Sequence, residues 1–466
     1  MTIGLPELER RIAQDLRRIA HPNRLWVPPA AAPDGRPVRN VLVIGAGHSG
    51  LGIAFALGRA RIDNVLVVDA RPAGTEGPWR TYARMDTLRT AKDLIGPDGD
   101  LPNLTFQAWF EAQHGEDAWA AMTLIPREMW ADYLLWFRRI LDVPVENGVR
   151  VLSLSGEGPY VRAEIERDGK RDHILAREVV IATGFDGSGG AQIPEALVAN
   201  LPRTLWAHTS DEAIDPAHFR GRRVGVLGAG ASAFDNAIWA LENGASEAHL
   251  FVRRPSLPAI NFMRGVEYAG FFRHFPELDD ARRWRFMRVM FSLSTPPPPA
   301  TLEKARATPG FHMHLGCPWQ SARAIGHEAE VETPQGRHRF AFLIFGTGYA
   351  MDVRRQPELA ACADNIALWR DRYAPTSGEE SETLARQPYL GPGFELLEKT
   401  PGRTPWFAHV RYWAIASWGS MGPAAVGLNG YKYGLPRLID GIGRSLFLAD
   451  ADAHYDAYLA TARPAP

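Results

Sequence analysis

The segment VLVIGAGHSG, residues 41–50, decides the fold of this chain. Its first four residues form a continuous apolar run, which is typical of a strand buried on both faces of a parallel sheet. Gly45, Gly47 and Gly50 follow in the pattern G-x-G-x-x-G. In this pattern the first glycine permits a tight turn, the second lets the backbone approach a pyrophosphate, and the third lets the helix pack closely on the strand. The segment therefore predicts a dinucleotide-binding strand–turn–helix unit.

The next apolar run supports this prediction and suggests the ligand. The segment NVLVVDARPA, residues 64–73, ends its apolar run at Asp69, 19 residues beyond Gly50. A carboxylate at this point accepts hydrogen bonds from the hydroxyls of a ribose, so an unphosphorylated ribose is expected here. A chance glycine turn is the alternative, but it does not account for the acid at the expected spacing.

The same pattern recurs in RRVGVLGAGASAFDNA, residues 222–237. A short apolar strand precedes Gly228 and Gly230, and Ala233 takes the third position, which only has to be small. The chain therefore contains a second dinucleotide unit.

The second unit ends its second strand in the opposite charge. In AHLFVRRPSL, residues 248–257, Arg253 and Arg254 stand where the first unit has an acid. A guanidinium can pair with a 2′-phosphate through two hydrogen bonds, so this unit is predicted to bind NADPH. The alternative is that both arginines are solvated surface residues. Because a flavin accepts the hydride that a nicotinamide donates, FAD is the natural ligand of the first unit.

Two similar strands mark where the second unit is inserted in the first. EVVIATGFDG (residues 178–187) and AFLIFGTGYA (residues 341–350) both end an apolar run in Thr-Gly and flank the second unit. We therefore predict an α/β fold with two Rossmann-like domains, the NADPH domain being inserted in the FAD domain. The predicted divisions are an N-terminal helical extension (1–37), the first part of the FAD domain (38–185), the NADPH domain (186–340), and the rest of the FAD domain with a C-terminal segment (341–466).

Composition places the chain in the ordinary globular class. Its 466 residues are 45% hydrophobic and 23% charged, and the formal charge of −1 gives no indication of a nucleic-acid partner. Cys317 and Cys362 match neither a metal pattern nor a redox pair, so no metal site is predicted and a cytoplasmic location is expected. Residues 5–19 space their apolar side chains as an amphipathic helix does, and we expect this helix to pack on the protein rather than on a membrane. No apolar run is long enough to span a bilayer, and no secretory signal is recognisable.

The motifs resemble those of the class B flavoprotein monooxygenases, which include flavin-containing and Baeyer–Villiger monooxygenases and N-hydroxylases. The resemblance covers nearly the whole chain and rests on GAGHSG, EGPW (residues 76–79), the IATG and FGTGY borders, GAGASA, and AHTSD (residues 207–211). The N-terminal extension and TYARMDTLRTAKDLIGP (residues 81–97) look most like the bacterial type II flavin-containing monooxygenases. The family's F-x-G-x-x-x-H signature keeps only His208, since Pro202 and Thr204 occupy its other two positions.

The resemblance implies a reaction and a set of residues. NADPH reduces FAD, O₂ adds to form a C4a-peroxyflavin, and one oxygen atom enters a small organic substrate; NADH is also accepted in this branch. The catalytic candidates are Arg89 and Lys92, which could tune the peroxide, and His208, which could order the interdomain linker. A structural ion pair is the alternative for Arg89, as is a structural role for His208. The residues predicted to bind cofactors are Gly45, Gly47, His48, Ser49, Gly50, Asp69, Ala70, Trp79, Gly184, Gly228, Gly230, Ser232, Ala233, Arg253, Arg254, Thr347, Gly348 and Met421.

Three functions remain open at this point. The first is Baeyer–Villiger oxidation of ketones with sulfide and amine oxygenation as side activities. The second is amine N-hydroxylation on the same fold, and the third is a flavin reductase that passes electrons to a protein partner. The expected partners are a small organic substrate and O₂, with no nucleic acid, no transmembrane segment and a homodimer as the oligomeric expectation.

Overall fold

The first glycine turn follows the central strand of a seven-stranded sheet. A computed structural model describes residues 2–94, 96–293 and 295–461. The order of the sheet is β3-β2-β1-β6-β5-β4, and β15 also pairs with β6. The strands are β1 (Val38–Ile44), β2 (Val65–Asp69), β3 (Val145–Asn147), β4 (Val149–Glu157), β5 (Tyr160–Arg167), β6 (Lys170–Gly184) and β15 (Val410–Ala414).

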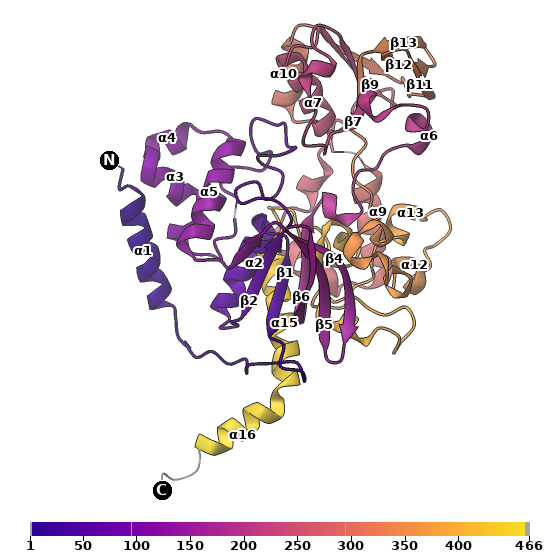
Figure 1. Ribbon diagram of the computed structural model, residues 1–466. Coiled ribbons are helices and arrows are strands. Elements are labelled where there is room, and N and C mark those ends of the chain that lie inside the picture. Colours follow the sequence, from indigo (N-terminus) through magenta and orange to yellow (C-terminus); the bar gives the residue numbers. More distant parts are fainter. Residues whose placement is uncertain (1, 95, 294, 462–466) are drawn as a thin grey trace.

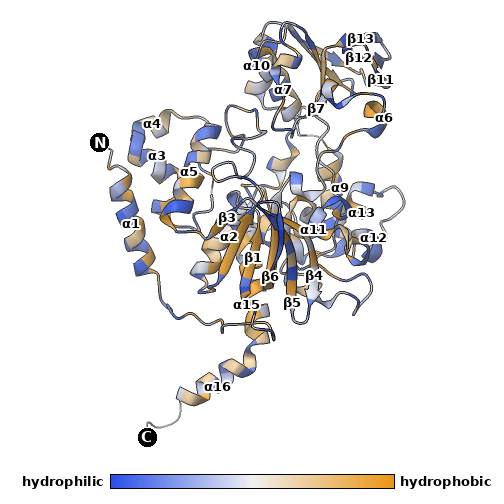
Figure 2. Ribbon diagram, viewed as in Figure 1, coloured by the Kyte–Doolittle hydropathy of each residue, from blue (hydrophilic) through white to orange (hydrophobic). Residues whose placement is uncertain are grey.

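The long strand β6 joins two kinds of sheet. Its first half pairs antiparallel with β5, and the partners run from Lys170 to Ala176. Its second half lies parallel to both β1 and β15. The parallel part is buried on both faces, as the apolar run after residue 41 predicts, and these strands are the hydrophobic centre of the molecule in Figure 2.

Helices cover this sheet, and the first of them forms part of the N-terminal extension. They are α1 (Leu5–Arg18), α2 (His48–Arg59), α3 (Phe106–His114), α4 (Glu116–Ala121), α5 (Arg127–Ile140) and α15 (Tyr431–Ala449). The predicted amphipathic helix is α1, which packs along α3 and buries Leu8 and Ile12 in the main core. Its packing on the protein is therefore confirmed. The last helix, α16 (Ala451–Thr461), projects away from the body at the bottom of Figure 1.

The second glycine turn belongs to a separate parallel sheet at the top of Figure 1. Its order is β10-β9-β8-β14-β7, with α7 and α10 packed together against it. A three-stranded antiparallel sheet, β11-β12-β13, adjoins it. The elements are β7 (Trp206–His208), β8 (Arg223–Leu227), α7 (Ala231–Glu242), β9 (Glu247–Val252), α10 (Pro299–Ala307), β10 (Phe311–Leu315), β11 (Ser321–Ile325), β12 (Glu328–Thr333), β13 (Gly336–Phe340) and β14 (Phe342–Phe345). Two Rossmann-like sheets with the second inserted in the first are thus the architecture that the sequence predicts.

Two details differ from the predicted divisions. Strand β14 follows residue 340, yet it pairs with β7 and β8, so the second sheet extends past the predicted boundary at 340/341. The chain crosses between the domains after β14, where an antiparallel bridge joins Ala191 to Tyr349 and so places the outgoing and returning linkers side by side.

The second difference is a helical unit built from two distant parts of the sequence. Helices α8 (Ala269–His274) and α9 (Asp280–Ser292) lie within the predicted NADPH domain, but they pack against elements of the C-terminal part. Trp284 and Trp369 are buried in the cluster that joins these parts. The remaining helices are α6 (Glu195–Val198), α11 (Pro357–Ala360), α12 (Trp369–Arg372), α13 (Glu382–Ala385) and α14 (Trp418–Met421). In Figure 1, α9, α12 and α13 lie together beside the first sheet.

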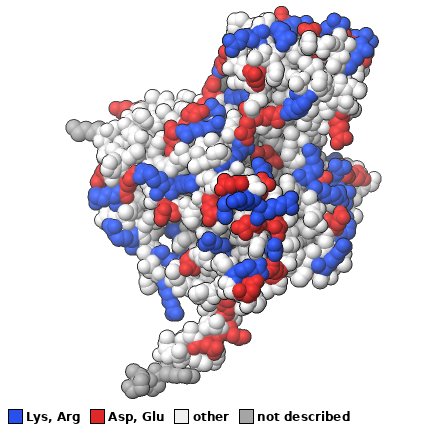
Figure 3. All heavy atoms as spheres, in the orientation of Figure 1, with Lys and Arg blue, Asp and Glu red and all other residues white. Residues whose placement is uncertain are grey.

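Charges of both signs alternate on the face shown in Figure 3. This interleaving agrees with a formal charge of −1. Among the described residues, no helix combines the length and the hydropathy needed to cross a membrane.

Candidate cofactor sites and the domain junction

The first glycine turn is shaped by three different constraints. Gly45 has φ 106°, and a Cβ there would lie 2.6 Å from the carbonyl oxygen of Ala182. A Cβ on Gly50 would lie 1.8 Å from the carbonyl oxygen of Gly45, so the helix packs directly on the turn. Gly47 differs, because a Cβ there would meet only the backbone of Gly77, whose Cα lies at 3.7 Å and whose N lies at 3.9 Å. The first and third glycines are therefore needed for packing, whereas the second faces open space.

That space is a small cavity at the N-terminus of α2. It is lined by Ala46, Gly47, Leu51, Gly74, Glu76, Trp79, Arg80, Ala131, Leu134, Leu135 and Arg138. A helix N-terminus offers free backbone N–H groups and the positive end of the helix dipole, which suits a pyrophosphate. The Trp79 indole N–H is buried without a hydrogen-bond partner among the described residues. The cavity, the N-terminus of α2 and the Trp79 indole N–H together form a cradle that fits the pyrophosphate portion of FAD.

Asp69 supports the turn through both of its carboxylate oxygens. Its Oδ2 accepts a hydrogen bond from the Ala46 N–H at 2.8 Å, and its Oδ1 accepts one from the Arg71 N–H at 2.8 Å. Burial raises the pKa of Asp69, although these two hydrogen bonds oppose the rise. The sequence analysis predicts only a contact to ribose, so the bracing role of Asp69 is an addition from the structure.

The residues flanking this turn have different environments. His48 is buried between Trp130 and Tyr431, and burial lowers its pKa to about 3, which keeps the ring neutral. Ser49 is buried, and its carbonyl accepts a hydrogen bond from the Tyr431 hydroxyl at 3.2 Å. Ala70 is exposed just after β2. His48 and Ser49 are thus both buried in the protein, and their predicted cofactor contacts stay predictions.

The predicted border residues lie where the two linkers meet. Gly184 ends β6 with φ 75°. Thr347 donates its hydroxyl hydrogen bond to the carbonyl of Gln192, and the Gln192 N–H donates to the Gly348 carbonyl at 2.9 Å. Met421, one of the residues predicted to bind a cofactor, is buried at the end of α14.

In the second glycine turn the first and third small residues are again needed for packing, and the second again has free space beside it. Gly228 has φ 149°, and a Cβ there would lie 2.4 Å from the carbonyl oxygen of Gly346. Ala233 is fully buried against this same turn, whereas Gly230 has open space around its Cβ position. Ser232 is exposed in the first turn of α7. The second turn therefore also presents its middle glycine to solvent at a helix N-terminus.

The two arginines after β9 are not equivalent. Arg253 is exposed immediately after the strand. Arg254 is half-buried, and its guanidinium donates a hydrogen bond to the Ser292 carbonyl at 3.4 Å. Arg253 is therefore the more available of the two for a phosphate at the end of this strand.

Arg89 forms an ion pair across the domain junction. Its guanidinium donates to the carboxylate of Asp235, a buried residue of α7 in the second domain. Burial raises the pKa of Asp235, and the Arg89 charge opposes that rise. The contact is the structural ion pair that the sequence analysis leaves open as the alternative for Arg89.

Lys92 and His208 also contact protein groups. The Lys92 ammonium donates to the Trp119 carbonyl at 2.6 Å, near the end of α4, and lies 4.8 Å from the centre of the Trp119 ring. His208 is fully buried at the end of β7, and burial lowers its pKa. Its ring lies 5.9 Å from that of Tyr349 in the returning linker. Their predicted catalytic roles stay predictions.

Two further contacts at this junction are missed by the sequence analysis. The Arg84 guanidinium donates to the Asp211 carbonyl at 2.9 Å and lies 4.6 Å from the Trp239 ring centre. Asp86 accepts from the Lys304 ammonium at 2.6 Å. We name residues 84–89 the junction strap, since each of its three charged side chains contacts the second domain. Only the concentration of charge in this short segment could have drawn attention to it.

Comparison with known proteins agrees with this architecture. A family model described as FAD-NAD(P)-binding matches residues 42–186, and one described as L-lysine 6-monooxygenase/L-ornithine 5-monooxygenase matches residues 118–289. Among solved structures, an ornithine hydroxylase from Pseudomonas aeruginosa has a TM-score of 0.69 at 17% identity, covering 88% of this chain and all of that one. An ornithine N-hydroxylase from Kutzneria sp. 744 has a TM-score of 0.67 at 15% identity, covering 88% of this chain and 99% of that one.

One curated relative is much more similar in sequence. The FAD-dependent urate hydroxylase of Xanthomonas campestris pv. campestris is 44% identical over 458 residues, which is 98% of this chain and 96% of the relative. The family resemblance seen in the motifs is thereby confirmed, as are the two predicted cofactor classes. The chain therefore belongs to the family of this hydroxylase, the flavin-dependent monooxygenases that use FAD and a nicotinamide dinucleotide.

Proposed function

We propose that this protein is an NADPH-dependent monooxygenase that hydroxylates urate or a closely related oxidised purine. The observation that carries the proposal is the 44% identity to a urate hydroxylase across both dinucleotide units and the helical unit. The solved N-hydroxylases have the same fold, but at 15–17% identity they support only the architecture.

The chain's own residues have separable tasks in this proposal. The Gly47 turn and the Trp79 indole would hold the FAD pyrophosphate, and bound FAD would supply the activation of O₂. The Gly230 turn and Arg253 would hold NADPH and select its 2′-phosphate. The junction strap would hold the second domain against the first. We expect this contact to keep bulk water out of the space between the two cofactors.

Amine N-hydroxylation is a second candidate. It is favoured by the lysine/ornithine monooxygenase model, which matches residues 118–289 and so spans part of both domains. Ketone oxygenation, the leading expectation from the motifs, stays a prediction that the same experiment can test. Electron transfer to a partner protein predicts no oxygenated small-molecule product.

The experiment compares substrates under ¹⁸O₂. FAD-loaded protein is supplied with NADPH and, separately, urate, L-ornithine, L-lysine, a cyclic ketone and an aryl sulfide. NADPH oxidation, hydrogen peroxide and labelled product are measured together. We expect urate to be consumed in step with NADPH, with one labelled oxygen atom in the product and little peroxide. Labelled product from an amine or ketone, but none from urate, would overturn the proposal.

A further inference from the structure

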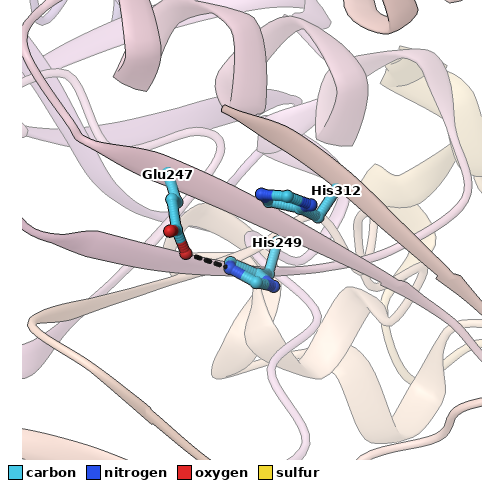
Figure 4. A group of neighbouring side chains, drawn as sticks. All are labelled: Glu247, His249 and His312. Carbon is cyan, nitrogen blue, oxygen red and sulfur yellow. Dashed lines mark hydrogen bonds and ion pairs between the residues drawn. The ribbon is translucent and has the colours of Figure 1, made fainter. Parts of the chain in front are cut away.

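A carboxylate and two imidazoles gather on one face of the second sheet. Glu247 and His249 lie two positions apart on β9, so their side chains share a face of the strand. The parallel strand β10 places His312 directly opposite His249. One potential ligand atom from each of the three residues lies within 4.8 Å of the other two. In Figure 4 the Glu247 carboxylate points at His249, and the ring of His312 lies next to that of His249.

The neighbours of His249 orient its ring. Its Nδ1 lies 2.9 Å from Nε2 of His314, the next residue on the same face of β10. Its Nε2 lies 2.8 Å from Oε2 of Glu247. When Nδ1–H donates to His314, the Nε2 lone pair faces the carboxylate. A second residue that holds the remote ring nitrogen is the usual companion of a metal-bound histidine.

A cationic group already lies at these two atoms. The Arg223 guanidinium places Nε 2.9 Å from Glu247 Oε2 and Nη2 3.2 Å from His249 Nε2. The Arg223 side chain is 42% exposed, so it can leave this position for solvent. The Glu247 carboxylate and the His249 Nε2 lone pair therefore share one cationic group that can move away. When the Arg223 guanidinium moves out, a metal ion can take its place.

We propose that Glu247, His249 and His312 bind a divalent transition-metal ion of the Zn²⁺ type. Imidazole nitrogen and carboxylate oxygen are ligands that Zn²⁺ accepts, with water completing a tetrahedral site. Bonds of about 2.0–2.1 Å place two ligand atoms roughly 3.3 Å apart in a tetrahedron. Glu247 Oε2 and His249 Nε2 lie 2.8 Å apart, somewhat closer than this, and the His312 ligand atom lies within 4.8 Å of the other two. Small rotations of the Glu247 side chain and the exposed His312 side chain bring the three atoms to these distances.

This site is distinct from the predicted dinucleotide site. Glu247 begins β9, whereas Arg253 follows its end, about 20 Å away at roughly 3.3 Å per residue. The ion would tie β9 to the edge strand β10 and so stabilise the second sheet, without entering the reaction. The absence of cysteine ligands led the sequence analysis to predict no metal site, and this proposal departs from that prediction.

The test measures Zn²⁺ binding to untagged, FAD-loaded protein that has been treated with a chelator and dialysed. Isothermal titration calorimetry gives stoichiometry and affinity, and Co²⁺ absorption reports the ligand geometry. We expect one ion per chain with micromolar or tighter affinity. His312→Asn should weaken binding more than about tenfold, because loss of even a residue that supports a ligand costs 10- to 100-fold. His327→Asn, an exposed histidine of the same domain, is the matched control and should bind as the wild type does.

Two further variants sharpen the result. His249→Asn should weaken binding like His312→Asn, and Arg223→Gln should tighten it, because the competing cation is gone. The exposed His312 makes the principal variant independent of any folding defect at the buried His249. Wild-type binding weaker than about 100 µM, or equal affinities for His312→Asn and His327→Asn, would overturn the proposal.

Discussion

Replacing Arg253 with alanine should change which nicotinamide coenzyme the enzyme prefers. Arg253 is exposed after β9, where the adenosine ribose of NADPH, which carries the 2′-phosphate, is expected. A hydrogen bond between charged groups contributes about 1.5–3 kcal/mol. At about 1.4 kcal/mol per factor of ten, this corresponds to roughly a 10- to 100-fold preference for NADPH. Because solvent and salt screen an exposed pair, we expect the lower end, near tenfold.

The assay measures steady-state oxidation of NADPH and of NADH, and hence KM for each coenzyme, at low and high ionic strength. Arg253→Ala should raise KM for NADPH about tenfold and leave KM for NADH nearly unchanged, with the difference shrinking at high salt. Arg254→Ala should have a smaller effect, since its guanidinium already contacts the Ser292 carbonyl. Arg306→Ala is the matched control, an exposed arginine in α10 of the same domain. An unaltered coenzyme preference in the Arg253/Arg254 double variant would refute the reasoning.

Three further predictions concern the cofactor cradle and the domain junction. Gly47→Val should lose most bound FAD, measured by flavin absorbance per chain, whereas Gly58→Ala, where a Cβ has open space, should retain it; full occupancy in Gly47→Val would mean that the cradle is misassigned. His208→Ala should raise the peroxide yield per NADPH more than it slows flavin reduction, and equal yields would remove His208 from the coupling of the two domains. Arg89→Ala leaves the buried Asp235 carboxylate without its cation and should cost about 1–3 kcal/mol of unfolding free energy at pH 7. Since burial raises the pKa of Asp235, its carboxyl is protonated more readily in the folded state, so this loss should shrink as the pH falls toward 5; a pH-independent loss in denaturant titrations would contradict the assignment.

The glycine turns are the part of the molecule that the sequence predicts best. The constraint on Gly50 arises within one strand–turn–helix unit, because a Cβ there would lie 1.8 Å from the carbonyl oxygen of Gly45, and Ala233 packs against Gly228 within the second unit. Local sterics of this kind leave a local pattern. The opposite charges at Asp69 and Arg253 are also readable, because each stands at a fixed distance from its own turn.

Contacts between distant segments leave no such pattern. Arg89 pairs with Asp235, 146 positions away, and nothing near either residue indicates the other. The same reason explains why α9, which follows the second glycine turn in sequence, could not be assigned to the helical unit. Its buried Trp284 packs against Trp369, and only the tertiary fold brings the two together. His249 and His312 are likewise neighbours only because β9 and β10 pair.

The shared helical unit determines how this enzyme can be recombined with its relatives. The two linkers lie side by side at the Ala191–Tyr349 bridge, so cuts at these linkers release the inserted sheet as one cassette for exchange between homologues. A cassette cut at those linkers would also carry α8 and α9, whose buried faces match partners left behind in the host. A chimaera that keeps the host's residues 262–293 preserves that interface, whereas one that replaces them must replace the C-terminal partners as well. To transfer coenzyme preference between homologues, the two parts of the inserted domain on either side of residues 262–293 are therefore best exchanged while this segment is kept from the host.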